Sequence, residues 1–201
     1  MGEWYDIVKW CNARSEKEGK TPAYYTDAGQ TVVYKAGRVD VQNDWVKWNS
    51  GYRLPTEAEW EKAARGGLSG QRFPWGNTIS ESQANYYSTN YYTYDLSNTG
   101  YNPSFNDGVP PYTSPVGSFA PNGYGLYDMA GNELQWCWDW SGSYSSGSQI
   151  DPRGPTRGSG RVVRGGNWNF RAFYCRAAYR VNGYPNGPNS LGFRSVLPPG
   201  Q

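Results

Sequence analysis

Aromatic side chains limit, more than any other feature, what this chain can fold into. Ten Trp, 18 Tyr and six Phe stand among its 201 residues, whereas hydrophobic residues make up 37% and charged residues 18% of the chain. Each large ring buries much surface, so a modest number can support a core that contains few Leu or Ile. Together with 26 Gly and 14 Pro, the rings predict an ordered chain of short strands, turns and long loops rather than a disordered one.

Two helices are expected in the first third of the chain. The first covers residues 4–18. Its apolar stripe consists of Trp4, Ile7, Val8 and Cys11, with Trp10 as a further candidate. The second helix begins at Thr56, where Thr56 and Glu59 form a capping box, and ends before Gly66.

The rest of the chain lacks long periodic segments. Residues 31–34 and 38–41 predict a hairpin, and short strands interrupted by Gly are expected within residues 117–140 and 161–196. Residues 67–112 are dominated by Gly, Asn, Ser, Tyr and Pro and predict one long loop. A loop of that length inside a single domain usually has a function or binds ions.

Charge and hydropathy exclude several kinds of partner. The net charge is +2 and no run of basic residues stands out, which argues against nucleic-acid binding. No apolar segment reaches the length of a membrane span, and no signal peptide precedes the first helix. These features favour a cytoplasmic or a phage- or virus-associated location.

Cysteine and histidine usage removes most familiar catalytic machinery. The three cysteines, Cys11, Cys137 and Cys175, are an odd number without metal-ligand spacing and predict no disulfide framework. The chain has no His. This absence excludes Ser-His and Cys-His nucleophile pairs, and also zinc or iron held by histidine.

A series of short motifs runs through most of the chain. They are Gly51-Tyr-Arg-Leu-Pro-Thr-Glu-Ala-Glu-Trp60, Phe73-Pro-Trp-Gly76, Pro115-Val-Gly-Ser118, Asn122-Gly-Tyr-Gly-Leu-Tyr127, Gly131-Asn132, Arg164-Gly-Gly166 and Leu191-Gly-Phe-Arg194. In this order they resemble the formylglycine-generating enzyme, or sulfatase-modifying factor, family over about residues 4–196. The resemblance implies an α+β fold of the formylglycine-generating-enzyme type of C-type lectin fold. It would have two helices, short strands and much irregular loop, in a single domain covering residues 1–201.

Domains of this family usually begin with several strands before the helix that Trp4 opens here. Only Met1, Gly2 and Glu3 precede that helix in this sequence, so the N-terminal strands of the family are expected to be missing. A sheet edge left uncovered would need protection. A second chain that completes the sheet is therefore one expected partner.

The family's oxidases hold copper between two cysteines that lie five residues apart after a Gly-Gly pair. The matching positions here are Phe170 and Cys175, and a phenyl ring cannot ligate a metal. Related iron-dependent sulfoxide synthases use three histidines, which this chain lacks. The resemblance therefore implies neither copper nor iron and favours a non-catalytic protein, with Cys175 as a small buried hydrophobic residue.

The family fold also carries structural calcium, for which oxygen ligands are needed. The first set of matching positions comprises Asn85, the Tyr86 carbonyl, Asp107 and the Val109 carbonyl. The second set comprises Asp128, the carbonyls of Gly131 and Glu133, and Gln135. Calcium there would order the long loop rather than catalyse a reaction. Alternatively, Asn85 and Asp107 serve only to cap turns.

Residues 167–194 alternate between positions typical of the family and positions of freer composition. This layout resembles the variable region of proteins diversified by retroelements, in which randomised adenines at Asn codons give NNC codons. Such codons cannot encode Lys, Glu, Gln, Trp or Met, and none of these five occurs at the freer positions. With the framework residue Trp168, the residues expected to bind a ligand are Asn169, Phe170, Arg171, Phe173, Tyr174, Tyr179, Val181, Asn182, Tyr184, Asn186, Asn189 and Ser190. Their composition is typical of a paratope, and Arg171 with the rings beside it is the expected hot spot.

The residues leave three functions open. The favoured one is a non-catalytic domain that binds a protein or another surface ligand through a diversified face. The second is an oxidase-like enzyme acting on a cysteine of a protein substrate, which copper-dependent turnover would reveal. The third is an accessory subunit that needs a partner chain, and monomeric behaviour in solution would count against it.

Overall fold

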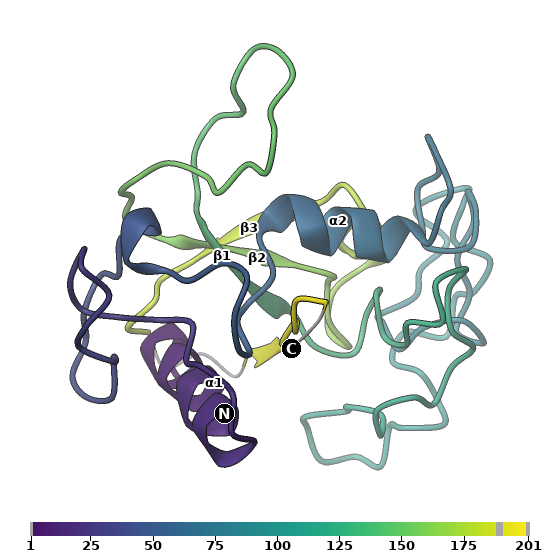
Figure 1. Cartoon of the computed structure of the whole chain (residues 1–201). Helices are drawn as coiled ribbons and strands as arrows, with labels where there is room; N and C mark the ends of the chain where they lie inside the picture. The colour runs from purple at the N-terminus through teal and green to yellow at the C-terminus, as the bar shows by residue number, and fades with distance from the viewer. Residues whose placement is uncertain (1, 188–190, 200–201) are drawn as a thin grey trace. The chain divides into compact units, whose positions relative to one another are not determined.

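The computed structural model describes residues 2–187 and 191–199. Its helices are α1 (Trp4–Lys17) and α2 (Glu57–Arg65), with two 3-10 turns, η1 (Asn43–Trp45) and η2 (Ala172–Cys175). The strands β1 (Gln135–Trp140), β2 (Arg161–Arg164), β3 (Arg180–Gly183) and β4 (Gly192–Phe193) form a sheet in the order β3-β2-β1-β4 (Figure 1). The described residues therefore form an α+β fold with two helices and short strands, as predicted.

The segment between α2 and β1 is one long irregular connection. Neither an α-helix nor a strand occurs between residues 66 and 134, which confirms the predicted loop and places the first strand later than residue 117. Among the described residues, no helix has the length and apolar character needed to cross a membrane.

The chain folds into two compact units, each assembled from segments far apart in the sequence. The first comprises Met1–Ala58, Trp136–Val162 and Asn182–Gln201, and the second comprises Glu59–Gln135 and Val163–Val181. The chain passes from one unit to the other within α2, β1, β2 and β3.

Helix α1 presents one apolar face to the core of the first unit. Trp4, Val8 and Cys11 are fully buried at helical spacing, as predicted. Trp10 does not join this stripe, because the period of 3.6 residues turns it away from the centre of that face. It is 45% exposed, and its ring lies edge-on to that of Phe193 at a centroid separation of 5.1 Å.

The predicted hairpin around Gly37 is wrong. Val33 makes an isolated antiparallel bridge with Tyr25 instead. The side-chain amide of Asn12, on α1, donates to the Tyr34 carbonyl at 3.0 Å. A tertiary contact to α1 therefore overrides the local turn signal.

A buried arginine lies at the centre of the first unit. The guanidinium carbon of Arg161 is 3.7 Å from the ring centroid of Trp4 and 3.5 Å from that of Trp140. Its Nη1 donates to the Trp138 carbonyl at 2.7 Å. Since Arg161 is only 1% exposed, the electron-rich faces of the indoles provide much of the stabilisation that water would give.

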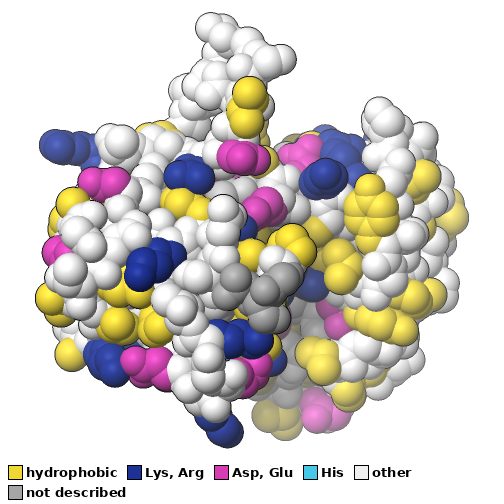
Figure 2. All heavy atoms as spheres, in the orientation of Figure 1, with side chains coloured by type: hydrophobic (Ala, Val, Ile, Leu, Met, Phe, Trp, Pro, Cys, Tyr) yellow, Lys and Arg dark blue, Asp and Glu magenta, His cyan; other side chains and the backbone are white. Residues whose placement is uncertain are grey.

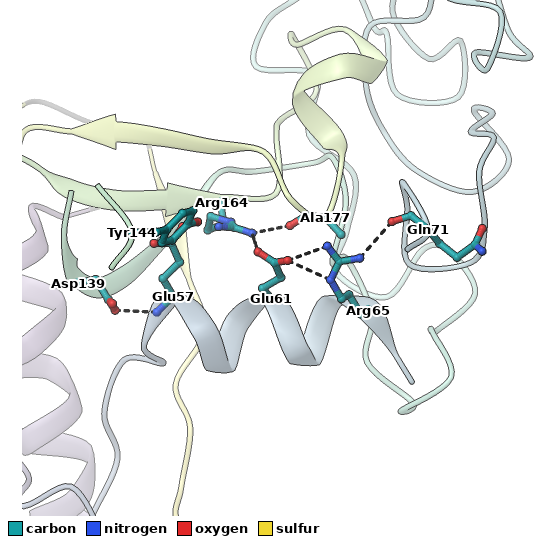
Figure 3. A network of polar contacts seen from close by, with 8 residues as sticks. All are labelled: Glu57, Glu61, Arg65, Gln71, Asp139, Tyr144, Arg164 and Ala177. Atoms are coloured by element: carbon teal, nitrogen blue, oxygen red, sulfur yellow. Dashed lines mark hydrogen bonds and ion pairs between the residues drawn. The ribbon is translucent and has the colours of Figure 1, made fainter. Parts of the chain in front are cut away.

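The N-terminus of α2 is capped by a carboxylate from β1. Oδ2 of Asp139 accepts a hydrogen bond from the Glu57 backbone N–H at 2.6 Å, and the Tyr144 hydroxyl donates to Oε1 of Glu57 at 3.0 Å (Figure 3). Asp139 is 4% exposed. Burial raises the pKa of this carboxyl to about 7, although the bond from Glu57 opposes the shift.

Farther along α2, Glu61 lies between two arginines of the second unit. Its Oε2 accepts from Nη2 of Arg164 at 2.6 Å, and its Oε1 accepts from Nη2 of Arg65 at 2.7 Å (Figure 3). Burial raises the pKa of Glu61, but the hydrogen bonds from these arginines lower it by more. Arg164 is completely buried and also donates to the Ala177 carbonyl. This network therefore ties together Arg164 and Ala177, the two ends of the segment that follows β2.

Candidate binding face and metal sites

The segment after β2 alternates between buried and outward side chains. In η2, Ala172 and Cys175 are fully buried, whereas Phe173 and Tyr174 between them are half-buried. Residues three apart lie on the same side of a 3-10 turn. The turn therefore directs its framework residues into the core and its freer positions outward.

Cys175 is the small buried residue that the sequence predicts. It packs in a core that includes Ile79 and Tyr86, and burial raises the pKa of its thiol to about 12. A Cβ built on Gly166 would lie 2.6 Å from its sulfur, so the thiol faces the backbone of the Gly-Gly pair. Phe170, at the position of the family's other cysteine, packs against Tyr174 with ring centroids 5.0 Å apart. These residues do not fit a copper ion held by two thiolates.

None of the residues predicted to bind a ligand is buried within the described part of the chain. Exposed are Asn169, Arg171, Asn182, Tyr184 and Asn186, and half-buried are Trp168, Phe170, Phe173, Tyr174, Tyr179 and Val181. Asn189 and Ser190 lie outside the described residues. Residues 168–181 belong to the second unit, whereas Asn182, Tyr184 and Asn186 belong to the first.

Trp168 belongs to a cluster of rings in the second unit. Its ring centroid lies 5.2 Å from that of Tyr112 and 5.7 Å from that of Tyr101. Tyr101 in turn meets Tyr87 at 4.8 Å, and its hydroxyl donates to Oδ1 of Asn169 at 3.1 Å. Rings from the long loop therefore hold Trp168 and Asn169 in place.

A second cluster of rings surrounds Phe173. Its centroid lies 6.0 Å from that of Tyr92, 5.4 Å from that of Tyr174 and 5.2 Å from that of Tyr179. Figure 2 shows hydrophobic side chains, tyrosine included, gathered over the loops that follow α2. The rings limit one another's rotation, which gives a comparatively rigid surface.

The sequence analysis did not predict that tyrosines of the long loop would form part of this ring cluster. Tyr91, Tyr92 and Tyr94 form a chain of rings with centroid separations of 4.8 and 5.1 Å, and Arg72 lies over Tyr94. The available signal was the run Tyr91-Tyr-Thr-Tyr94 inside a loop of small polar residues. Tyr92 of this run stacks on Phe173, which is so distant in the sequence that the run alone could not predict the contact.

The first predicted calcium set has one feature that favours a cation. Asn85 is 1% exposed, its Nδ2 donates to the Tyr112 carbonyl at 2.7 Å, and its Oδ1 is buried without a hydrogen-bond partner. Asp107 lies on an exposed turn, where its Oδ1 accepts the Val109 N–H at 3.0 Å. A buried amide oxygen without a donor suits a calcium ligand, so Asn85 is the residue of this set whose surroundings favour the ion.

The second predicted calcium set is already occupied by internal hydrogen bonds. Nε2 of Gln135 donates to the Asp128 carbonyl at 2.8 Å, and its Oε1 accepts from the Trp60 indole at 2.9 Å. Oδ2 of Asp128 accepts the Gly117 N–H at 2.7 Å. Of the other two residues, Gly131 is buried and Glu133 is half-buried. The described residues contain no cluster of three or more Cys, Asp or Glu side chains that could hold a metal, and this second set fits calcium less well than the first.

The fold and the Gly-Gly segment define a domain of the formylglycine-generating-enzyme type. Residues 2–198 match the Sulfatase-modifying factor enzyme 1-like domain, FGE-sulfatase. The chain therefore belongs to this family.

Its relatives include both enzymes and a variable protein. The chain is 40% identical to the formylglycine-generating enzyme of Thermomonospora curvata over 174 residues, which is 77% of this chain and 54% of that protein. It is 41% identical to that of Mus musculus over 196 residues, covering 95% of this chain and 50% of the relative. The chain thus spans about half the length of these curated relatives.

The solved structure of Treponema denticola variable protein 1 is also similar. Its TM-score is 0.76 at 37% sequence identity, over 98% of this chain and 70% of that one. The fold class inferred from the motifs and the resemblance to variable proteins are both confirmed.

Proposed function

We propose that this chain is a non-catalytic ligand-binding domain that presents residues 167–194 as a diversified face to a protein ligand. The observation that carries the proposal concerns the two positions that match the copper-binding cysteines of the family's oxidases. Phe170 has no sulfur at all, and Cys175 is completely buried. An oxidase site that needs two thiolates at one metal therefore lacks its ligands.

The arrangement of the face supports the same function. Its framework residues Ala172 and Cys175 are buried, whereas its rings Phe170, Phe173, Tyr174 and Tyr179 are half-buried and pack on one another. Positions of that kind can change identity without removing core packing, as a diversified surface requires. Rigid rings also lose little conformational entropy when a partner binds.

A copper titration separates this function from an oxidase. With a cysteine-containing sulfatase peptide as substrate, we expect no tight one-to-one copper complex and no oxygen consumption. The formylglycine-generating enzyme of Thermomonospora curvata serves as the positive control. One tightly bound copper ion together with turnover of the peptide would overturn the proposal.

The DNA beside the coding region tests diversification. A nearly identical repeat that differs from the segment encoding residues 167–194 only at adenines, next to a reverse transcriptase, would support a diversified face. Without such a repeat, the proposal reduces to a fixed ligand-binding domain.

We further propose that calcium binds at Asn85 and Asp107 and orders the long loop. Saturating Ca²⁺ at about 100 times the Kd should raise the free energy of unfolding by about 3 kcal/mol, a shift in Tm of roughly 5–10 °C. Asp107→Asn should weaken this response, because it removes a charged oxygen ligand. Asp151→Asn, at an exposed carboxylate elsewhere, is the matched control. Equal Tm with Ca²⁺ and with EDTA would contradict the site.

A further inference from the structure

Three arginines of the second unit lie against aromatic rings on its surface. The guanidinium carbon is 5.1 Å from the Tyr94 centroid for Arg72, 5.8 Å from Tyr91 for Arg171, and 3.8 Å from Phe173 for Arg176. The rings are joined through Tyr92, which stacks on both Tyr94 and Phe173. We call these three arginines and the rings beneath them the arginine–aromatic surface.

None of these three arginines forms a salt bridge within the described residues. Other arginines of the chain do: Arg14 pairs with Glu18, and Arg65 with Glu61. Asp95, on the same loop as the tyrosines, is 8% exposed and accepts hydrogen bonds from the Tyr86 hydroxyl and the backbone of Thr89 and Ser97. Within the described residues, no carboxylate therefore forms an ion pair with the arginines of the arginine–aromatic surface.

Stacking leaves a guanidinium able to bind an acid. A ring fixes the plane of the guanidinium, while its N–H edge stays available for a bidentate pair with a carboxylate. Arg72 and Arg171 are exposed, and Arg176 is half-buried with its Nε donating to the Phe173 carbonyl. Ordering these side chains in advance lowers the entropy lost on binding.

We infer that the arginine–aromatic surface binds an acidic protein segment through its carboxylates. The inference rests on the proposed ligand-binding function and names the chemistry of the partner. A net charge of +2 and the absence of a basic run argue against a nucleic acid, which requires many phosphate contacts. Arg72 and Arg176 lie outside the freer positions, so the preference for acids would persist while the face varies.

Poly-L-glutamate is the probe for this inference. We expect binding by isothermal titration calorimetry at low salt, and weaker binding as salt increases. The triple variant Arg72→Gln, Arg171→Gln, Arg176→Gln should lose affinity by about tenfold or more. Lys17→Gln, Lys62→Gln, Arg157→Gln removes the same charge from exposed positions elsewhere and should bind like the parent protein.

The geometry of the guanidinium gives a second variant. Replacing all three arginines by lysine keeps the charge but removes the planar fork, so an intermediate affinity is expected. A thermal melt of each variant shows that it is folded. The inference would be overturned if both glutamine variants lost the same affinity, or if the variant at Arg72, Arg171 and Arg176 lost none. Binding of inorganic polyphosphate as tight as that of poly-L-glutamate would also overturn it. Absence of poly-L-glutamate binding would also overturn it, whereas only copper-dependent oxidation would overturn the proposed function.

Discussion

Replacing Gly131 by alanine is expected to lower the free energy of unfolding by roughly 2–5 kcal/mol. Gly131 has φ +73°, and a Cβ there would lie 2.3 Å from the backbone oxygen of Asn85. Backbone atoms cannot move aside as the end of a flexible side chain can. The substitution would therefore add overlap to the cost of a left-handed conformation.

Gly125→Ala is the matched control for Gly131→Ala. Gly125 has φ +74°, and a Cβ there would meet nothing within 4 Å. This variant should lose only the conformational cost of about 1–2 kcal/mol. Chemical denaturation of both variants measures the difference in the free energy of unfolding. Equal decreases in the two variants would show that residue 131 does not lie close to the Asn85 carbonyl.

The consequence of Gly131→Ala should extend to the binding face. Displacing Asn85 would move Tyr87, two residues later, whose N–H donates to the Phe170 carbonyl at 3.0 Å. We therefore expect the variant to lose calcium stabilisation and poly-L-glutamate binding together. Gly125→Ala should keep both.

Acidification from pH 8 to pH 4 is expected to stabilise the protein through Asp139. Its native pKa of about 7 lies above the ordinary value of 3.8 because the carboxyl is buried. Between these values the folded state holds a proton that the unfolded chain releases, so the contribution of Asp139 to stability is largest below pH 4 and falls as pH rises through 7. The difference of about three units between the native and the ordinary pKa corresponds to about 4 kcal/mol in the free energy of unfolding.

Asp139→Asn isolates this effect. An amide oxygen can still accept the Glu57 N–H at the start of α2, but the side chain no longer titrates. Denaturation across this pH range should give a flatter profile for the variant, which should be more stable than the parent at pH 8. Glu133, half-buried with a pKa also raised to about 7 by burial, should supply a smaller remaining slope. A variant profile parallel to that of the parent would contradict the assignment.

Local sequence determines those elements whose signals act over one turn of chain. Helix α2 begins after Thr56 and ends before Gly66, as its capping and stop residues predict. The apolar spacing of α1 predicts its buried face because that periodicity is a property of the helix alone. The lack of a sulfur ligand at residue 170 can likewise be read directly from the sequence, since no packing can give a phenyl ring a sulfur atom.

The tertiary structure decides what depends on distant partners. The bridge from Val33 to Tyr25 replaces the predicted hairpin, and Asp139 caps a helix that begins 82 residues earlier. The stack of Tyr92 on Phe173 joins the long loop to the segment that follows β2. Ring packing depends on orientation and on centroid distances of a few ångströms, and no period or spacing in the sequence records either. The sequence by itself therefore determined the family, whereas only the folded chain placed the arginines on their rings.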